Sequence, residues 1–241
     1  MRLSFVIAYY DNPAMLAEQY RVWSTYGDEA KAAIEVCLVD DGSPRWPAVE
    51  VPRPPGLPAL RIFRFLEDRP WNQDAARNLG AHMARHPWLL CTDMDHVVPA
   101  ATLDVLLAQK NKGLVYTFGR VDAPGLTPTL GPDGRPKPHP NSFAMTRALF
   151  WKVGGYDEAY SGRGVYGTDG MFLARARGWA SFHRLADAPL IRYPRTVIAD
   201  ASTTTLSRER TDLKREIAAE KEAAGQAAAI ETLTQAWERV L

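Results

Sequence analysis

The sequence predicts an α/β fold in which a mostly parallel central sheet lies between two layers of helices. Short apolar runs at 3–10, 33–43, 60–65 and 88–95 have the composition of buried strands, and segments with helical periodicity lie between them. Strands joined through helices pair in parallel and place those helices on the faces of the sheet. The second and fourth runs end in acidic residues, at the carboxyl edge where such sheets bind ligands.

The first half of the chain follows this order. Residues 3–10 are apolar throughout, as expected of a strand buried on both faces. A helix is expected over 13–26, because Pro13 stands at its start and apolar residues recur at helical spacing. Residues 44–58 hold too many prolines for regular structure and are expected to form a surface loop. A second helix is expected over 71–86, just before the fourth strand.

The second half continues with a helix expected over 101–109 and a strand over 113–121. Residues 122–141 form a long loop rich in proline and glycine, and such loops in compact domains are usually functional or disordered. Residues 143–178 are expected to contain a strand, a short helix, a glycine-rich turn and another helix. Residues 205–241 are rich in Ala, Glu, Lys and Arg, and we expect them to be helical, with Gly225 as a possible break, and docked on the domain.

The composition indicates a packed globular protein. The chain has 241 residues, of which 46% are hydrophobic and 24% charged, with a formal net charge of +1. This balance lacks the large positive field that dominates nucleic-acid affinity. Cys37 and Cys91 lie in apolar runs and are expected to be buried free thiols. A signal peptide is not expected and no run is long enough to cross a bilayer, so we expect a cytoplasmic protein, with peripheral attachment to a membrane left open.

Several stretches resemble the family-2 glycosyltransferases in one order and spacing. These are FVIAYYDNP (5–13), LVDDGS (38–43), DAARNLGAHMA (74–84), TDMDHVVP (92–99) and the segment from Phe150 to Gly178 that contains GGYDE and TDG. The last segment, together with LIRYPR (190–195), is also similar to the β-1,4-galactosyltransferases of the same fold. The resemblance covers roughly residues 2–195.

The resemblance implies a GT-A fold and the transfer of a sugar from a nucleoside diphosphate, usually with inversion. It implies a single domain over 1–204, with a nucleotide-sugar half at 1–98 and an acceptor half at 99–204. The helical extension at 205–241 lies outside the resemblance. The donor is expected to be a UDP-sugar.

Asp93 and Asp95 are the predicted metal site. Residues i and i+2 of a strand face the same side, so both carboxylates can reach one ligand. Oxygen ligands suit Mn²⁺ or Mg²⁺, and a divalent cation stabilises the charge of a departing diphosphate. The resemblance gives the ribose to Asp93 and the metal to Asp95. An isolated D-x-D pair would otherwise be read as two solvated acids at a strand end.

The resemblance also implies a set of residues that bind the nucleotide sugar. Asp41 matches the position that bonds the base or ribose, and Tyr10 matches the aromatic ring that stacks on the base, with Tyr9 as the alternative. Arg77 matches the arginine near the nucleotide, for which a surface ion pair is the alternative. The full set is Ala8, Tyr10, Asp41, Arg77 and Asp93.

The acceptor half supplies the expected general base. Asp169 matches the second acid of the family's E-D pair, whereas Thr168 replaces the first; helix capping is the alternative role for Asp169. Acceptor contacts are expected from Trp151, Gly155 and His139. Related metal-dependent enzymes carry a further histidine ligand where this chain has Tyr193. His96 and His183 are nearby in sequence, but the sequence places neither on the metal.

Other functions remain open at this point. A nucleotidyltransferase would need a glycine-rich phosphate loop after the first strand, and AYYDNPAM (8–15) has no glycine. A non-catalytic nucleotide-sugar or glycan-binding module is the main alternative. The acceptor could be a glycan, a protein, a lipid or a modified nucleobase, and the C-terminal helices could form a homodimer.

Overall fold

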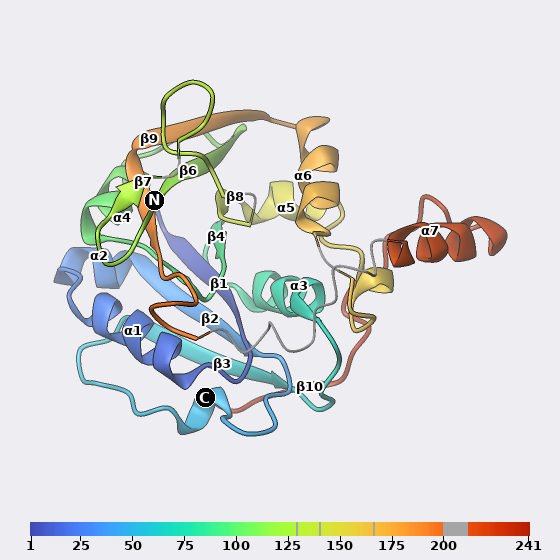
Figure 1. The fold of residues 1–241 in the computed structure, drawn as a ribbon, viewed down its shortest axis with the longest axis horizontal. Coiled ribbons are helices and arrows are strands. Elements are labelled where there is room, and N and C mark those ends of the chain that lie inside the picture. The colour runs from blue at the N-terminus through green and yellow to red at the C-terminus, as the bar shows by residue number, and fades with distance from the viewer. Residues whose placement is uncertain (129, 140, 166, 200–211) are drawn as a thin grey trace.

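The computed structural model describes residues 1–128, 130–139, 141–165, 167–199 and 212–241. Its helices and strands follow one another from a strand at the N-terminus to a short strand near the C-terminus (Figure 1). In chain order they are β1 Leu3–Tyr9, α1 Pro13–Ser24, α2 Asp28–Ala33, β2 Ile34–Asp40, η1 Ala48–Glu50, β3 Ala59–Phe65, α3 Gln73–Met83, β4 Trp88–Thr92, β5 His96–Val97, α4 Ala100–Leu107, β6 Leu114–Asp122, β7 Thr127–Pro128, β8 Phe143–Thr146, α5 Arg147–Lys152, η2 Glu158–Tyr160, α6 Asp169–Arg177, β9 Ser181–Arg192, α7 Leu213–Ala223 and β10 Trp237–Arg239.

One sheet runs through the molecule in the order β10-β3-β2-β1-β4-β8-β6-β9-β5, with β7 paired to β6. The four central strands β3, β2, β1 and β4 are parallel to one another. Beyond β4 the sheet is mixed, because β8 pairs antiparallel to both β4 and β6, whereas β9 is parallel to β6. The predicted α/β class with a mostly parallel centre is therefore confirmed.

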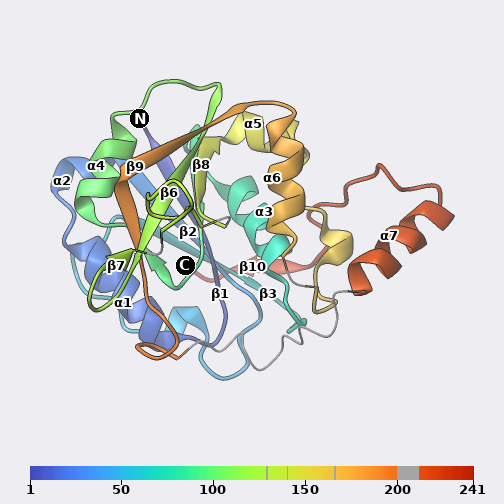
Figure 2. The same cartoon turned by 45° about the horizontal axis from the view of Figure 1, so that its top comes forward.

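Helices cover both faces of the sheet and bury two apolar clusters. Alternate residues of β1 point to opposite faces: Phe5 and Ile7 pack with α1 and α4, whereas Val6 packs with α3, α5 and α6. Figures 1 and 2 show α1, α2 and α4 on one side of the strands and α3, α5 and α6 on the other. This is the expected three-layer arrangement.

Both cysteines are free and buried, as predicted. Cys37 is on β2 and Cys91 on β4, and both pack in the cluster under α3. Within the described ranges, no helix combines the length and the apolar character needed to span a bilayer.

The C-terminal region is less helical than its composition predicts, although the helix does end near the expected break at Gly225. The helix α7 ends at Ala223, and Gly225 follows with a φ of +69°, in the left-handed region that ends helices. The chain then returns to the sheet, where β10 pairs antiparallel to β3 and Trp237 packs edge-on against Phe63, with 5.8 Å between the ring centroids. The predicted boundary between residues 204 and 205 lies outside the described residues.

Two further elements are absent from the sequence prediction. The helix α2 is only six residues long and buries none of them, so it leaves no hydrophobic period. The strand β9 mixes charged and apolar residues and contains Pro189, which hides the alternation typical of a strand. Its pairing with β6 shifts register between Phe118 and Arg120.

Candidate active site at the carboxyl edge of the sheet

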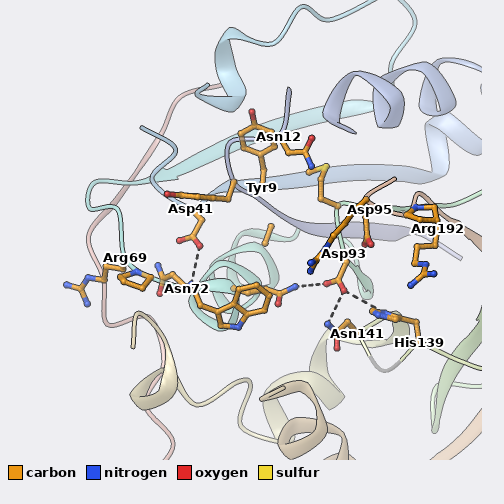
Figure 3. A pocket seen from close by; sticks show the side chains of 18 of the residues that line it. Tyr9, Asn12, Asp41, Arg69, Asn72, Asp93, Asp95, His139, Asn141 and Arg192 are labelled. Carbon is orange, nitrogen blue, oxygen red and sulfur yellow. Dashed lines mark hydrogen bonds and ion pairs between the residues drawn. The ribbon is translucent and has the colours of Figure 1, made fainter. Parts of the chain in front are cut away.

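A cavity of about 770 Å³ opens beyond the carboxyl ends of β1, β2 and β4. Its size is within the range of small-molecule sites, and its position is where parallel sheets bind ligands. Figure 3 shows Asp41 at one end and Asp93, Asp95, His139 and Arg192 at the other. The lining residues are Ala8, Tyr9, Tyr10, Asn12, Asp41, Asp68, Arg69, Pro70, Trp71, Asn72, Gln73, Asp93, Met94, Asp95, Arg120, His139, Asn141, Arg192, Pro194, Arg195 and Thr196.

Asp41 offers an unused acceptor at one end of this cavity. Its Oδ2 accepts a hydrogen bond from the backbone N–H of Asn72 at 3.2 Å, whereas its buried Oδ1 has no hydrogen-bond partner among the described residues. Burial raises the pKa of Asp41 well above its usual range. An unsatisfied buried acceptor is costly, and a ligand N–H donor would satisfy it.

Asp40, the residue before it, shapes the turn. Its carboxylate accepts hydrogen bonds from the backbone N–H groups of Ser43 at 2.8 Å and Ala48 at 2.7 Å. Gly42 has a φ of +73°, and a Cβ there would lie 2.7 Å from the backbone oxygen of Glu67. The D-D-G-S turn is therefore held by Asp40, which leaves Asp41 free to face the cavity.

Tyr9 and Tyr10 have different environments. Tyr9 is fully buried, and its hydroxyl donates to the backbone oxygen of Trp46 at 2.6 Å. Tyr10 is half-buried on the cavity wall, and its hydroxyl donates to Asp68 at 3.2 Å. Tyr10 is therefore the ring better placed to stack on a base. Asp11 is at a φ of +43° and accepts hydrogen bonds from the backbone N–H groups of Arg45 and Trp46, at 3.1 and 2.9 Å.

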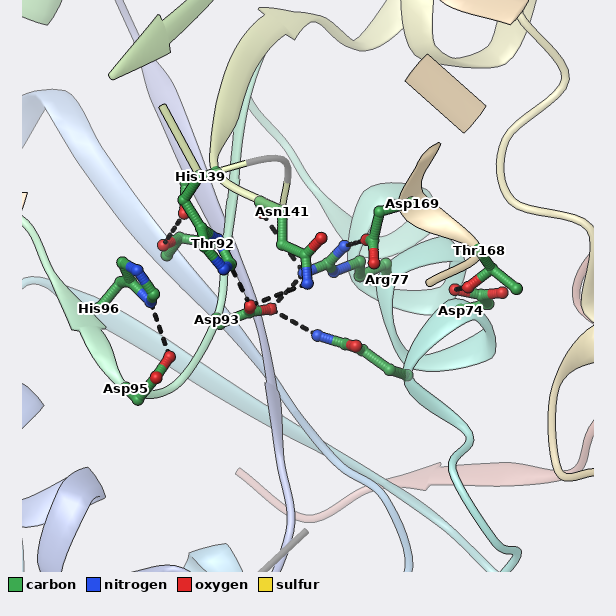
Figure 4. Close-up of polar contacts among 12 residues, drawn as sticks. Asp74, Arg77, Thr92, Asp93, Asp95, His96, His139, Asn141, Thr168 and Asp169 are labelled. Atoms are coloured by element: carbon green, nitrogen blue, oxygen red, sulfur yellow. Dashed lines mark hydrogen bonds and ion pairs between the residues drawn. The ribbon is translucent and has the colours of Figure 1, made fainter. Parts of the chain in front are cut away.

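Asp93 is the centre of a polar network in the middle of the cavity (Figure 4). Its Oδ1 accepts from Gln73 at 2.5 Å and from the guanidinium of Arg77, and its Oδ2 accepts from Asn141 at 2.9 Å. Charge-assisted bonds of this kind fix a carboxylate in one orientation. Asp93 is thus held by α3 on one side and by the 122–141 loop on the other.

Arg77 joins Asp93 to Asp169. It is fully buried, and its two terminal nitrogens form ion pairs with these two carboxylates. The hydroxyl of Tyr156 lies 2.9 Å from the Arg77 guanidinium and 3.3 Å from Asp169. Burial raises the pKa of Asp169, and its ion pair with Arg77 opposes that rise. Arg77 therefore makes a buried ion pair and not a surface one.

Thr168, at the start of α6, also contacts a buried acid. Its hydroxyl donates to Asp74 of α3 at 2.8 Å. Burial and the nearby charge of Asp169 raise the pKa of Asp74 to about 7. Thr168 replaces the first acid of the expected E-D pair, and Asp74 of α3 places a carboxyl group next to it.

Asp95, His96 and His139 lie next to one another beyond Asp93. The Nδ1 of His96 is 2.6 Å from Asp95 Oδ1, and the His96 and His139 ring centroids are 4.2 Å apart. Burial opposes ionisation of Asp95, but His96, His139 and Arg192 outweigh it, and its pKa is lowered. Burial lowers the pKa of His139 to about 4.

These residues fit a divalent cation. One atom each from Asp93, His96 and His139 lies within 4.8 Å of the others, and the His96 Nε2 is buried without a hydrogen-bond partner in the described part of the chain. Imidazole and carboxylate are ligands of divalent transition-metal ions. Tyr193, at the position expected for a further histidine ligand, is not among the lining residues, and its hydroxyl donates to Glu18.

Arginines form the wall beyond Asp95. Arg120 of β6, Arg192 of β9 and Arg195 all line the cavity. Arg192 makes two hydrogen bonds to Asp122, at 2.8 and 2.6 Å. Guanidinium groups suit phosphate oxygens, so this wall can bind an anionic group near Asp95.

The predicted site residues fall into three groups. Those that line the cavity are Ala8, Tyr10, Asp41, Asp93, Asp95 and His139. Arg77 and Asp169 are directly behind Asp93 and are linked to it by ion pairs. Trp151 and Gly155 are elsewhere: Trp151 packs edge-on against Phe150, and a Cβ on Gly155 would meet the Asn78 Oδ1 at 2.8 Å.

Several lining residues have no signal in the sequence. Gln73 and Asn72 are polar residues at a helix start, where capping is their ordinary role. Asn141 lies in the proline-rich loop, and Arg120 and Arg192 belong to strands that meet only in the folded sheet.

Comparison with known proteins gives a family match and similar folds. A profile described as glycosyl transferase family 2 matches residues 4–166. A search of curated proteins found no match. The likenesses to the solved structures below are under 20% identical in sequence and show the fold alone.

The similar structures include TarS 1–349 of S. aureus, with a TM-score of 0.62, 18% identity, and coverage of 80% of this chain and 60% of that one. The same protein in complex with UDP-GlcNAc gives a TM-score of 0.63 at 16% identity, covering 91% of this chain and 66% of the other. GalNAc-T7 with UDP, GalNAc and Mn²⁺ gives 0.63 at 16% identity, covering 80% and 44%. The chain thus spans well under two thirds of the GalNAc-T7 structure and about 60% of TarS 1–349.

Proposed function

The chain belongs to glycosyl transferase family 2, and from this premise we propose that it transfers a sugar from a UDP-sugar to a hydroxyl acceptor with inversion. One observation carries the proposal: a single cavity holds Asp41, with an unused buried acceptor oxygen, and Asp93, which is linked through Arg77 to Asp169. The complexes of TarS with UDP-GlcNAc and of GalNAc-T7 with UDP support the choice of donor.

We propose that the nucleotide lies along the cavity from Asp41 to the arginine wall. Asp41 accepts a hydrogen bond from a base N–H, and the half-buried ring of Tyr10 stacks on the base. The carboxylate of Asp93 receives a sugar hydroxyl or the ribose, while Arg120 and Arg192 face the diphosphate. This orientation is supported by the order of these residues along the cavity, from β2 through β4 to β6 and β9.

Asp169 is the proposed general base. The acceptor hydroxyl gives its proton to this carboxylate while its oxygen attacks the anomeric carbon, and the bond from that carbon to the diphosphate oxygen breaks on the opposite face. Arg77 and Tyr156 keep Asp169 in one orientation. Because Asp169 is buried behind Arg77, the acceptor must enter deeply enough to reach it past that side chain.

A divalent cation bound near Asp93 and Asp95 would stabilise the charge on the leaving diphosphate. Mn²⁺ and Mg²⁺ are the proposed ions, and the Mn²⁺ in the GalNAc-T7 structure supports the former. The acceptor, an interface between two copies through α7, and contacts from Trp151 and Gly155 all stay predictions. So do the division into halves at residues 98 and 99, a β-1,4-galactosyltransferase-like acceptor half and a cytoplasmic location.

The test is a donor screen. The protein is incubated with UDP-sugars and Mn²⁺, and UDP release is measured with and without hydroxyl acceptors. We expect one UDP-sugar to be turned over faster than the rest, and the same protein to bind UDP in calorimetry. If UDP binds and no donor is turned over with any acceptor, the chain is a binding module. If UDP does not bind either, the proposed donor is wrong.

A further inference from the structure

We propose that the C-terminal segment completes the nucleotide end of the cavity. Gln235 is a positioning residue that holds Asn72 and, through the backbone of Asn72, fixes the carboxylate of Asp41 for the base. The inference rests on the proposed function for the identity of the ligand, a uridine nucleotide. Gln235 lies beyond residues 4–166, the part of the chain that the family profile matches.

The side chain of Asn72 is the first observation. Asn72 is fully buried at the N-cap of α3, where an asparagine side chain ordinarily accepts a hydrogen bond from the first turn of its own helix. Here its Oδ1 accepts instead from the Ser161 hydroxyl at 2.6 Å and from the Gln235 Nε2 at 2.5 Å. The Ser161 hydroxyl in turn accepts from the backbone N–H of Ala75 at 3.2 Å, so Ser161 caps α3 in place of Asn72. The Asn72 side chain is thus directed toward the C-terminal segment.

The amide groups of Asn72 and Gln235 exchange a pair of hydrogen bonds. Asn72 Nδ2 donates to Gln235 Oε1 at 2.8 Å, and Gln235 Nε2 donates back to Asn72 Oδ1. Gln235 is only 8% exposed, so the pair is sheltered from water. A buried amide that loses its partner keeps the cost of its desolvation, and this asymmetry holds both side chains in one orientation.

The backbone of Asn72 connects this pair to the cavity. Its N–H donates to Asp41 Oδ2 at 3.2 Å (Figure 3), whereas Asp41 Oδ1 is buried without a partner among the described residues. The bond that one carboxylate oxygen makes sets the rotation of the group, so the position of the Asn72 N–H determines where Oδ1 points. Gln235 therefore acts on base recognition through one intermediate residue.

The segment that ends at Asn72 depends on such outside contacts. Residues 68–72 supply five consecutive lining residues of the cavity. Trp71 has a φ of +51°, in the left-handed region that non-glycine residues seldom adopt, and the backbone N–H of Gly162 donates to its backbone oxygen at 3.2 Å. Such a backbone persists where its surroundings determine it, and Gln235 supplies two bonds to the next residue.

Gln235 itself is fixed on both sides along the chain. Before it, the backbone N–H groups of Leu233 and Thr234 donate to the buried carboxylate of Glu158, at 2.7 and 2.9 Å. After it, β10 pairs with β3 at the edge of the sheet, as Figure 1 shows. A backbone already in place presents the Gln235 side chain to Asn72, so little further ordering is needed to form the pair.

The test compares Gln235→Met with the wild type. Methionine keeps roughly the length of glutamine but cannot form the amide pair. We expect the UDP affinity, measured by isothermal titration calorimetry, to fall by about 3- to 10-fold, the worth of roughly one net hydrogen bond. With a donor that is turned over, KM should rise by a similar factor and kcat should change by less than about 2-fold, because the base lies away from the reacting atoms. Gln226→Met changes an exposed glutamine of the same extension and should bind UDP as the wild type does.

The route through Asp41 is tested in a second background. In Asp41→Ala the carboxylate that Gln235 positions is gone, so the added change Gln235→Met should weaken UDP binding by less than about 2-fold. A merely structural role of Gln235 would lower the affinity by the same factor in both backgrounds. Additive effects therefore overturn the proposal, as does a UDP affinity of Gln235→Met equal to that of the wild type.

Hydrogen exchange of the Asn72 backbone N–H, followed by nuclear magnetic resonance without ligand, tests the same contact independently of UDP. Exchange should be about 5-fold or more faster in Gln235→Met than in the wild type and Gln226→Met, and an unchanged rate overturns the proposal. If the wild type does not bind UDP, the proposed function fails, and this rate still decides whether Gln235 holds Asn72.

Circular dichroism checks the folding of each variant. If Gln235→Met does not fold, Gln235→Glu replaces it, because a glutamate keeps the acceptor for Asn72 Nδ2 and loses one bond of the pair. The same effects are then expected at a smaller size, and an unchanged UDP affinity in Gln235→Glu overturns the proposal.

Discussion

Arg77 is fully buried between Asp93 and Asp169, so three charges share one low-dielectric space. Each ion has lost most of its hydration, and their mutual attraction offsets that loss only while all three are present. The arrangement places a fixed positive charge between the middle of the cavity and the proposed base. At this scale, Arg77 links Asp93, in the middle of the cavity, to Asp169, the proposed base.

Replacement of Arg77 by Met should therefore destabilise the fold. The change leaves two buried carboxylates without their cation, and we expect the free energy of unfolding to fall by about 3–5 kcal/mol. Urea denaturation followed by circular dichroism measures it. Arg69→Met, which breaks an exposed pair with Glu67, is the control and should have little effect. Equal stabilities of the wild type and Arg77→Met would contradict the role given to this ion pair.

Asp41→Ala should weaken UDP binding. The buried, unpartnered Oδ1 is the proposed acceptor for the base, and leaving a buried hydrogen-bonding group without its partner costs about 1–3 kcal/mol, or roughly 5- to 150-fold in affinity. Isothermal titration calorimetry with UDP measures the change. Asp68→Ala, at the same end of the cavity, should weaken UDP binding less than Asp41→Ala does, because Asp68 is exposed and its carboxylate accepts the Tyr10 hydroxyl. A UDP affinity that is unchanged in Asp41→Ala would move base recognition elsewhere.

Asp169→Asn should separate binding from chemistry. The amide keeps the shape of the side chain but cannot take a proton, so transfer should fall by about 10²- to 10⁴-fold while UDP affinity stays within a few-fold of the wild type. Rates of UDP release with acceptor present, together with calorimetry, give both numbers. Near-normal turnover would place the base on another residue.

Individual site residues were predictable only where they belong to a recognisable sequence motif. Asp41, Asp93 and Tyr10 follow strands in a recognisable order, and they line the cavity as expected. His139 was given an acceptor role, although it contacts Asp93 and His96. The reason is that a loop residue's neighbours depend on distant contacts, here the Thr92–Ser142 hydrogen bond, which no local pattern encodes.

At the scale of elements, the packing of α3 on β1 sets how closely the site's two walls approach. Gly80 of α3 lies directly over β1, and a Cβ at this position would be 2.6 Å from the Val6 Cγ1. Asn78, on the same helix, donates to the backbone oxygen of Tyr156 and to Glu158, both at 2.8 Å. The A-R-N-x-G pattern thus combines a charge in the site, an anchor for the segment that holds Tyr156 and Glu158, and a close helix–strand contact.

Gly80→Ala should destabilise the protein by about 1–3 kcal/mol, because the added methyl group overpacks the contact with β1. Chemical denaturation measures the loss. The double variant Val6→Ala/Gly80→Ala removes the clashing methyl groups. Its loss in free energy of unfolding should therefore be smaller than the sum of the losses in the two single variants. Strict additivity would show that Val6 is not what limits the space.

Strongly periodic elements were predictable, and weakly patterned ones were not. The four parallel strands and helices α1, α3 and α4 lie within a few residues of their expected ranges. The composition of 205–241 favours helix throughout, yet Glu158 accepts hydrogen bonds from Leu233 and Thr234, at 2.7 and 2.9 Å, and β10 joins the sheet. Tertiary contacts override propensity in this segment.

At the scale of the whole molecule, the fold buries three acids with raised pKa values in or near one cavity. Asp41, Asp74 and Asp169 each have a raised pKa, and burial is the first cause in every case. Burial in the protein removes water from these carboxyl groups and disfavours their charged forms. Stability is therefore expected to depend on pH through these groups.

The sign of that dependence follows from Asp74. Its pKa is about 7 in the folded chain, against an ordinary value of 3.8, so between these pH values the folded state binds more protons than the unfolded state. The protonated carboxyl of Asp74 can be buried at little cost, so the free energy of unfolding is highest at low pH. It falls as the pH rises toward 7, because the folded chain must then hold a charged, buried carboxylate. Above that pH both states are ionised and the contribution is constant.

Asp74→Asn should flatten this profile. The amide oxygen can still accept the Thr168 hydroxyl, but the side chain no longer ionises. We expect the wild type to lose stability from pH 5 to pH 8 by at least about 1 kcal/mol more than the variant does, since each unit of pKa shift is worth about 1.4 kcal/mol. Urea denaturation at pH 5, 6, 7 and 8 measures both profiles, with Asp104→Asn on the exposed face of α4 as the control. Parallel profiles for the wild type and Asp74→Asn would mean that Asp74 titrates alike in the folded and unfolded chains, and that the burial of this acid is relieved by water entering from the cavity.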